Sequence, residues 1–169
     1  MSLKIIIDID DTINYWLDHY KKWYNTDKYP KHLENHVITR NVYKLRDNKD
    51  FWLSVPVARY PDFEIVAYCT KRINKKNITR EWLLKNGFQD APIYQQYYQG
   101  GSKSKLIKGR CDVFIDDSIS NFLECNSNGV FTLLIDAPHN QGFDTPFRIY
   151  SLEYREIEEK YYLTHNASN

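Results

Sequence analysis

The stretch that decides the expected fold is Leu3-Lys4-Ile5-Ile6-Ile7-Asp8-Ile9-Asp10-Asp11-Thr12. A short, isoleucine-rich run that ends abruptly in acids is typical of a buried parallel strand, whose last side chains reach the carboxyl edge of the sheet. Ligands of open α/β folds bind at that edge. Because carboxylates two residues apart repel each other, Asp8 and Asp10 are expected to share a metal cation or a proton. The alternative for this segment alone is a solvated acidic turn.

Two further apolar runs also end in reactive side chains. Residues 64–69 lead into Thr70, and residues 112–115 lead into Asp116 and Asp117. A plausible helix follows each run, so strands and helices alternate and the sheet is expected to be mostly parallel. The acids then gather at one edge of that sheet.

Two helix boundaries can be predicted from the pattern. A helix is expected over residues 75–86, ended by Gly87 in the left-handed conformation. Ser118 is well placed to cap the helix that follows Asp117. The residues expected to be buried in the first helix are Ile78, Trp82 and Leu83.

The order of these parts resembles the haloacid-dehalogenase-like hydrolase superfamily. Its four motifs fall on residues 8–12, Thr70, Lys103 or Lys105, and residues 116–117. The resemblance implies an α/β fold, a Rossmann-like three-layer sandwich with a mostly parallel sheet and a small helical cap inserted after the first strand. Within the superfamily, three stretches look like the 5'(3')-deoxyribonucleotidase group and its bacterial and phage relatives. These stretches are Phe114-Ile115-Asp116-Asp117-Ser118, residues 134–140 and residues 51–56.

Length and composition fit one compact catalytic domain spanning residues 1–169. A hydrophobic fraction of 42% is enough for a core, and a net charge of +1 gives no broad electrostatic footprint for nucleic acid. No stretch approaches the ~20 apolar residues of a membrane span. A cytoplasmic protein is therefore expected, and its oligomeric state stays open. The cysteines lack a Cys-x-x-Cys spacing and are interpreted as reduced structural thiols: Cys69, Cys111 and Cys125.

The segment between the first two core strands is longer than a crossover helix needs. Residues 14–56 are therefore expected to form a small helical cap. Aromatic residues recur in it: Trp16, Tyr20, Trp23, Tyr24, Phe51 and Trp52. A stripe of this kind is usually packed in a core. The alternative is that one or two rings, with Trp16 and Trp52 as candidates, face the acids and stack on a nucleobase.

The acids suit the chemistry of a phosphomonoester phosphatase. A phosphomonoester is a dianion, so an attacking carboxylate needs a cation that binds both partners. Mg²⁺ held by Asp8, the main-chain carbonyl of Asp10 and Asp116 fits this need, with Asp117 as a supporting residue. Asp8 is then the expected nucleophile, which forms an aspartyl-phosphate intermediate. Asp10 is the expected general acid and base.

Other groups are expected to hold the transferring phosphoryl group. Thr70, at a strand end, can donate its hydroxyl and main-chain N–H to a phosphoryl oxygen. Among the lysines, Lys103 is preferred because it begins a helix whose aliphatic residues pack inward. Lys105 is the second choice and Lys76 a distant third.

The remaining polar features are interpreted as surface. Asp11 and Asp18 are expected to face solvent. His32 and His36 are interpreted as a surface pair, because no acid or cysteine pattern accompanies them. The basic residues after Thr70 can hold extra phosphates of an oligonucleotide end, but a solvated helix face explains them as well. They are Lys71, Arg72, Lys75, Lys76 and Arg80.

Three functional interpretations compete. The first is a Mg²⁺-dependent phosphatase of small phosphomonoesters, with a nucleoside or deoxynucleoside monophosphate favoured by the family resemblance and the aromatic cap. The second keeps the chemistry but acts on polynucleotide 3'-phosphate ends or on sugar phosphates. The third is a non-catalytic, metal-binding interaction module. Loss of Asp8 or Asp10 would be the simplest mark of a dead site, and both are present.

Overall fold

The computed structural model describes residues 2–27, 43–96 and 101–166. Within this part of the chain, six strands form one sheet in the order β3-β2-β1-β4-β5-β6, and every neighbouring pair is parallel. The strands are β1 (Ile5–Ile7), β2 (Ile65–Thr70), β3 (Ile93–Gln95), β4 (Val113–Asp116), β5 (Thr132–Ile135) and β6 (Arg148–Ile149). The predicted α/β fold with a mostly parallel sheet is confirmed.

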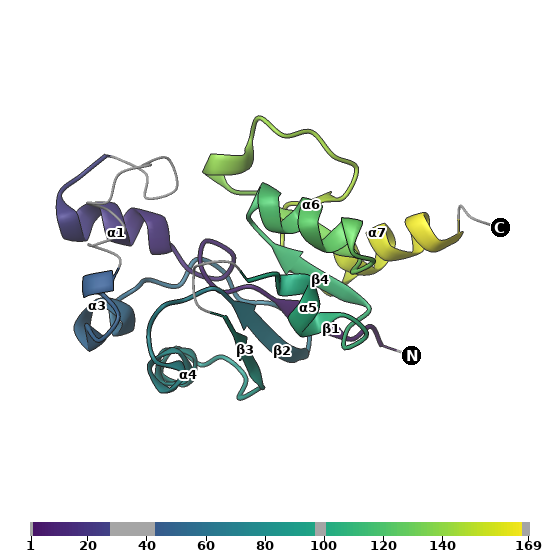
Figure 1. Ribbon diagram of the computed structural model, residues 1–169. Helices are drawn as coiled ribbons and strands as arrows, with labels where there is room; N and C mark the ends of the chain where they lie inside the picture. The colour runs from purple at the N-terminus through teal and green to yellow at the C-terminus, as the bar shows by residue number, and fades with distance from the viewer. Residues whose placement is uncertain (1, 28–42, 97–100, 167–169) are drawn as a thin grey trace.

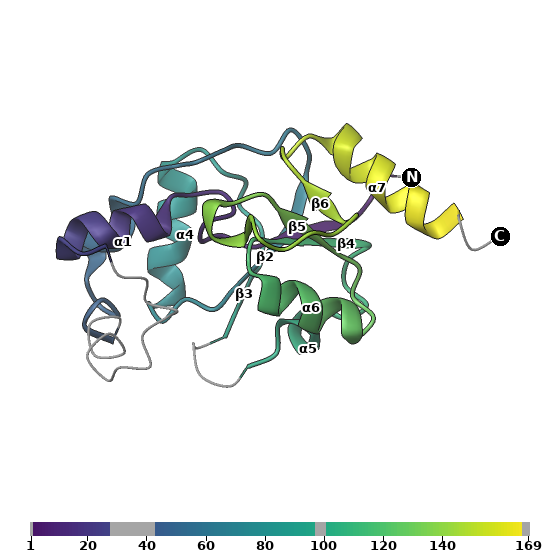
Figure 2. The same cartoon turned by 90° about the horizontal axis from the view of Figure 1, so that it is seen from above.

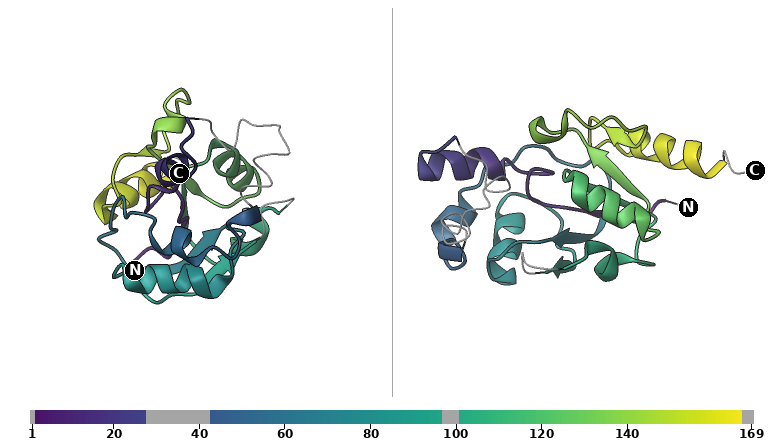
Figure 3. Two further views of the ribbon diagram at one scale, coloured as in Figure 1. Left: turned by 90° about the vertical axis from the view of Figure 1, so that its left-hand side faces the viewer. Right: turned by 45° about the horizontal axis from the view of Figure 1, so that its top comes forward.

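Helices cover both faces of this sheet. They are α1 (Trp16–Tyr24), α3 (Lys49–Leu53), α4 (Lys76–Lys85), α5 (Lys103–Ile107), α6 (Ile119–Ser127), α7 (Tyr154–Asn166) and the 3₁₀ helix η2 (Pro138–Asn140). Helices α4 and α7 lie over one face and α5 and α6 over the other, which gives the predicted three layers (Figures 1 and 2). Helices α1 and α3 lie together beyond the sheet (Figure 3). No helix in the described ranges has both the length and the apolar character that crossing a membrane requires.

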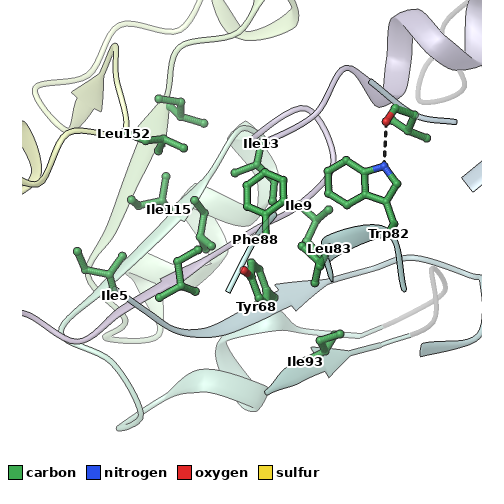
Figure 4. Close-up of a cluster of buried hydrophobic side chains, with 14 of the residues drawn as sticks. Ile5, Ile9, Ile13, Tyr68, Trp82, Leu83, Phe88, Ile93, Ile115 and Leu152 are labelled. Carbon is green, nitrogen blue, oxygen red and sulfur yellow. Dashed lines mark hydrogen bonds between the residues drawn. The ribbon is translucent and has the colours of Figure 1, made fainter. Parts of the chain in front are cut away.

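The central strands are continuous apolar runs, because helices bury both faces of the sheet. In β1, Ile5 and Ile7 belong to the larger core cluster under α4 and α7. Ile6 points the other way and packs with residues of α5 and α6. Figure 4 shows the larger cluster, where the indole N–H of Trp82 donates to the carbonyl of Val55 at 2.8 Å. This bond ties α4 to the chain that follows α3.

Strand β2 contains a β-bulge that the sequence pattern does not predict. Ile5 of β1 pairs with Ile65, whereas Ile6 pairs with Ala67, so Val66 is the extra residue. Val66 and Ala67 both pack on the α5 and α6 side of the sheet. Because side chains alternate along a strand, a bulge changes the face to which every later residue points, including the last one.

The order of the strands places two acids side by side. The chain runs outward from β1 through β2 to β3, then returns to β4 on the other side of β1 and continues to β5 and β6. Ligands of open α/β sheets bind where the order reverses in this way. Asp8 follows β1 directly and its N–H donates to the carbonyl of Ile115 at 2.9 Å, while Asp116 ends β4. The carboxyl edge between β1 and β4 is therefore the expected site.

The helix predicted over residues 75–86 is confirmed as α4. Its buried residues include Ile78, Trp82 and Leu83, as expected. Gly87 follows the helix with φ of 78°, in the left-handed region. Replacement of Gly87 by alanine is expected to lower the free energy of unfolding by about 1–2 kcal/mol, because an L side chain is strained at this φ. Denaturant unfolding measures the change.

The matched control for this substitution is Gly142→Ala. An added Cβ at Gly87 or at Gly142 meets no heavy atom within 4 Å, but only Gly87 has a positive φ. Gly142→Ala is therefore expected to leave stability unchanged or slightly raised. Equal losses at the two positions would show that backbone conformation is not the cause.

Ser118 corrects one part of the sequence prediction. It occupies the N-cap of α6 as expected, but its side chain makes no capping hydrogen bond. The hydroxyl instead lies 2.9 Å from the hydroxyl of Ser120. Its main-chain N–H donates to Asp116 Oδ1 at 2.8 Å. The contribution of Ser118 is thus to hold a carboxylate, and α6 begins without side-chain capping.

The three cysteines form no disulfide bond. Cys69 and Cys125 are buried, and Cys111 is partly buried. Burial raises the pKa of Cys69 and of Cys111 to about 12. Both side chains are therefore neutral thiols at physiological pH, as expected for cysteines that only pack.

Candidate active site

A cavity of about 360 Å³ opens at the carboxyl edge of the sheet. It is lined by residues from the loop after β1, from the end of β2 and the loop after it, from α5, and from the loop after β4 and the start of α6, together with two rings from α1 and α3. The predicted site residues that line it are Asp8, Asp10, Thr70, Lys103, Asp117, Trp16 and Trp52. Asp116 lies next to them and is fully buried. The structure thus brings together residues that are up to about a hundred positions apart in the chain, such as Asp8 and Asp117.

Lys103 bridges the two central carboxylates. Its Nζ lies 2.6 Å from Asp8 Oδ1 and 2.7 Å from Asp116 Oδ2. The lysine is 1% exposed, which is unusual for this residue type unless it is paired. Lys105, the second choice from the sequence, is exposed and does not line the cavity. The structure therefore brings Lys103 to the acids and leaves Lys105, like Lys76, on the surface.

The acids around Asp8 outnumber the positive charge that Lys103 supplies. Burial raises the pKa of Asp8, and although Lys103 acts to lower it, the neighbouring Asp116 and Asp117 raise it further. The pKa of Asp8 is held well above its ordinary value as a result. For Lys103, burial acts to lower the pKa, but the two carboxylates outweigh it and raise the pKa well above the ordinary value. The lysine thus stays charged, and one positive charge faces several acids.

Asp116 is fixed by two neighbours in the loop and helix that follow it. Asn121 Nδ2, on α6, donates to both carboxylate oxygens of Asp116 at 3.2 Å. The N–H of Ser118 adds a third bond. Lys71 Nζ in turn donates to Asn121 Oδ1 at 2.7 Å. Asn121 is not among the residues predicted from the sequence, although its place near the start of the helix after Asp116-Asp117 was visible there.

Asp117 faces a different set of partners. The hydroxyl of Thr12 donates to Asp117 Oδ1 at 3.3 Å, and His139 Nε2 lies 2.6 Å from Asp117 Oδ2. His139 comes from η2, which follows β5, and it was not singled out in the sequence. Asn140 supports the same loop by donating to the carbonyl of Asp117 at 2.8 Å. Both residues lie in the stretch 134–140, where the resemblance to nucleotidases was the available signal.

The expectation that Asp11 faces solvent is wrong. Its Oδ1 accepts a hydrogen bond from the N–H of Leu17 at 2.9 Å, and the residue has a positive φ of 59°. Burial and the nearby Asp117 raise the pKa of Asp11 to about 7. The turn after β1 brings Asp11 close to the other acids, and the sequence pattern does not show this turn. Asp18, by contrast, is exposed as predicted.

Asp10 is bound by Arg72, which corrects the interpretation of this one residue as part of a solvated helix face, while Lys75, Lys76 and Arg80 are exposed as that interpretation expects. Arg72 Nε lies 3.0 Å from both Asp10 oxygens, and its Nη2 lies 2.6 Å from Oδ1. The guanidinium is 5.1 Å from the ring centroid of Trp52 and 5.5 Å from that of Trp82. Arg72 is 2% exposed and precedes α4. A planar guanidinium held by rings and a carboxylate is a fixed part of the pocket wall.

Thr70 ends β2 and is buried at the cavity wall. Its Oγ1 accepts a hydrogen bond from the N–H of Arg72 at 3.3 Å. The hydroxyl hydrogen is thus available for another acceptor in the cavity, and the phosphate-binding role of Thr70 stays a prediction.

The two candidate tryptophans have different surroundings. Trp52 is 2% exposed, and its indole N–H donates to the carbonyl of Leu45 at 2.7 Å. Trp16 is only partly buried and stacks on Tyr20 with ring centroids 5.4 Å apart. Its indole N–H is buried and has no hydrogen-bond partner in the part of the chain that the structure describes. The core interpretation therefore fits Trp52, whereas Trp16 retains a donor for a ligand. The predicted pair His32 and His36 lies outside the described residues.

Three carboxylates could hold a metal ion together. One oxygen each from Asp8, Asp116 and Asp117 lie within 4.8 Å of one another, and all three residues are buried. Hard carboxylate oxygens are what Mg²⁺ requires, and the charge imbalance around Asp8 favours a divalent cation. The residues present therefore fit the metal that the sequence predicts.

Comparison with solved structures supports the fold. No protein-family model and no curated protein matches the sequence. Among solved structures, a HAD-superfamily hydrolase of subfamily IA from Geobacter sulfurreducens is similar with a TM-score of 0.55 and 13% identity, over 94% of this chain and 95% of that one. A haloacid-dehalogenase-like hydrolase from Streptococcus pneumoniae gives 0.53 and 11%, over 96% and 98%. At these identities the likeness concerns the fold alone, and both structures share the α/β fold that was predicted from the sequence.

Proposed function

We propose that this protein is a Mg²⁺-dependent phosphomonoester hydrolase that acts through an aspartyl-phosphate on Asp8. The observation that carries the proposal is the buried cluster in which Lys103 Nζ lies within hydrogen-bonding distance of both Asp8 and Asp116. This cluster stands beside a cavity at the edge where the strand order reverses. A buried lysine between acids at such an edge suits the binding of a transferring phosphoryl group.

The metal would be held by Asp8 and Asp116, by the main-chain carbonyl of Asp10, and with support from Asp117. When bound, Mg²⁺ supplies positive charge against the phosphate dianion and orients its oxygens. The chain itself supplies the other positive charge through Lys103. Thr70, which also lines the cavity, can donate its hydroxyl to a phosphoryl oxygen.

The reaction then consists of two transfers of the phosphoryl group. In the first, a carboxylate oxygen of Asp8 bonds to phosphorus as the bond to the alcohol oxygen breaks, and the alcohol takes a proton. In the second, water attacks the aspartyl-phosphate and gives up a proton as Asp8 is released. Asp10 is the proposed acid and base for these proton transfers. Arg72 donates several hydrogen bonds to Asp10 and so fixes the position of this carboxyl group at the cavity.

We propose a nucleoside or deoxynucleoside monophosphate as the substrate. The segment of residues 14–56 would act as a small cap on the single domain, and it places Trp16 and Trp52 at the cavity. The ring of Trp16, whose N–H has no partner among the described residues, suits a planar base with hydrogen-bond acceptors. The resemblance to the deoxyribonucleotidase group supports the same substrate class.

The alternatives have less support. A polynucleotide 3'-phosphate end needs basic residues for its other phosphates, but Lys75 pairs with Asp47, and Arg80 pairs with Asp90. A sugar phosphate needs no aromatic wall. The non-catalytic module does not explain why a lysine is buried between two acids, at the cost of dehydrating all three groups.

A phosphate-release screen with Mg²⁺ tests the proposal. The substrates are deoxynucleoside and nucleoside monophosphates, sugar phosphates and a 3'-phosphorylated oligonucleotide. Turnover is expected on the monophosphates and is expected to stop when EDTA removes the metal. Activity confined to the oligonucleotide would favour the second function, and Mg²⁺ binding without turnover on any substrate would favour the third.

Trp16→Ala tests the contact with the base. Because stacking on an aromatic ring contributes about 1–3 kcal/mol per base, KM for nucleoside monophosphates is expected to rise by roughly tenfold. Sugar phosphate turnover should be unchanged. Trp23→Ala is the matched control, since Trp23 lies on the same helix, is 44% exposed and does not line the cavity. An equal effect on sugar phosphates and nucleotides would mean that Trp16 only packs.

A further inference from the structure

Helix α5, which carries Lys103, is too short to hold its own position. It has five residues, Lys103–Ile107. Helices of this length are not stable alone in water, so contacts with the rest of the protein must fix them. The side chain of Lys103 also has four rotatable bonds, and its ammonium must reach two carboxylates at once. Contacts outside the cavity must therefore fix the position of α5 and the direction of the Lys103 side chain.

Glu124 of α6 binds the residues on both sides of Lys103. Ser104 Oγ donates to Glu124 Oε1 at 2.5 Å, and the Ser104 N–H approaches Oε2 at 3.4 Å. Ser102 Oγ also donates to Glu124 Oε1. The same Ser102 hydroxyl accepts the N–H of Lys105 at 3.3 Å and so caps the helix. One carboxylate thus fixes the chain immediately before and immediately after the lysine.

We infer that Glu124 is a positioning residue that aims Lys103 at Asp8 and Asp116, an inference that rests on the proposed function of this site. With Ser102 and Ser104 both held by Glu124, the Cα of Lys103 has a fixed place against α6. From there the lysine stem passes Phe114, with Nζ 5.4 Å from the ring centroid, and the ammonium reaches both acids.

The charge of Glu124 is suited to this task. Partial burial acts to raise its pKa, but hydrogen bonds donated by Ser102, Ser104 and Cys125 outweigh burial and lower the pKa. Glu124 is therefore ionised at neutral pH, and hydrogen bonds to an ionised acceptor are stronger than neutral ones. Glu124 does not line the cavity, so it acts only through Lys103.

Glu124→Ala is the test, and Asn126→Ala on the same helix is its matched control. Alanine is a good helix former, so α6 should persist in both variants. Asn126 donates to the carbonyls of Phe122 and Thr132 at 3.0 and 3.1 Å, and it has no bond to α5. Glu124→Ala is expected to lower kcat by roughly ten- to a hundredfold with little change in KM, because displacing a group by about 1 Å costs about that much. Asn126→Ala should lower stability but leave kcat unchanged.

Glu124→Gln provides the conservative rescue. Its amide oxygen can still accept from one serine, so its kcat is expected to lie between those of the wild type and Glu124→Ala. A wild-type kcat in Glu124→Ala, or a fall no larger than that in Asn126→Ala, would overturn the inference.

Hydrogen exchange separates this inference from the proposed function. If the wild-type protein releases phosphate from no substrate, the proposed function fails, and the role of Glu124 is judged on the main-chain amides of α5. Faster exchange in Glu124→Ala than in Asn126→Ala would support the placement of α5 by Glu124. Equal exchange in the two variants would refute it.

Discussion

Asp8→Asn is expected to reduce phosphate release by at least about 10³-fold, because an amide oxygen cannot replace the attacking carboxylate. The fold should survive this change. The amide is nearly the same size as the carboxyl group, and its oxygen can still accept from Lys103 Nζ, which keeps its bond to Asp116. The substitution also removes a buried carboxyl group. Burial and the neighbouring acids hold the pKa of this group above its ordinary value. The free energy of unfolding is therefore expected to stay the same or to rise.

The pairing of lost activity with retained stability is what identifies the nucleophile. Phosphate release under substrate saturation and denaturant unfolding without Mg²⁺ measure the two quantities. Asp18→Asn, an exposed change in α1, should affect neither. If Asp8→Asn retains more than about a tenth of the wild-type rate, the nucleophile is another group and the proposed mechanism fails.

The predictions from sequence that proved correct concern local features. The runs before Asp8 and before Asp116 are apolar on both faces, which is typical of strands in a parallel sheet that helices cover on both sides. Acids at the ends of such strands must meet at the carboxyl edge. Helix α4 was also predictable from local features, because the helical spacing of its buried residues and the Gly87 that follows it lie within one short stretch.

The parts that the sequence could not show depend on contacts between distant segments. In the sequence, Arg72 looks like one more basic residue before a helix. Only the fold brings its guanidinium close to the rings of Trp52 and Trp82 and to the carboxylate of Asp10. Lys103 and Lys105 are similarly spaced from the acids in sequence, and the direction of α5 decides between them. That direction depends on Glu124, which no motif marks. Side-chain partners far apart in the chain therefore completed a site whose acids were already predictable.

Lys103→Met is expected to lower the free energy of unfolding by about 3–5 kcal/mol in the absence of metal, because it leaves two buried carboxylates without their counter-charge. Methionine fills a similar volume, so a cavity contributes little to the loss. Turnover is expected to fall by about 10²- to 10³-fold, because the variant lacks the ammonium group that stabilises the negative charge on the transferring phosphoryl group. Mg²⁺ should stabilise this variant more than it stabilises the wild type, because the cation takes over part of the lost positive charge.

The pH dependence of this loss has a definite sign. Burial already raises the pKa of Asp8 above its ordinary value of 3.8, and Lys103 opposes that rise, so its removal raises the pKa further. A carboxyl group with a raised pKa in the folded state binds its proton more tightly there than in the unfolded chain. Its contribution to stability is therefore complete below the ordinary value and is lost as pH rises through the folded pKa. Lys103→Met should be less destabilising at about pH 5 than at about pH 8. Lys105→Met, an exposed change on the same helix, should show no such dependence, and an equal loss in the two variants would mean that the ion pairs of Lys103 do not stabilise the site.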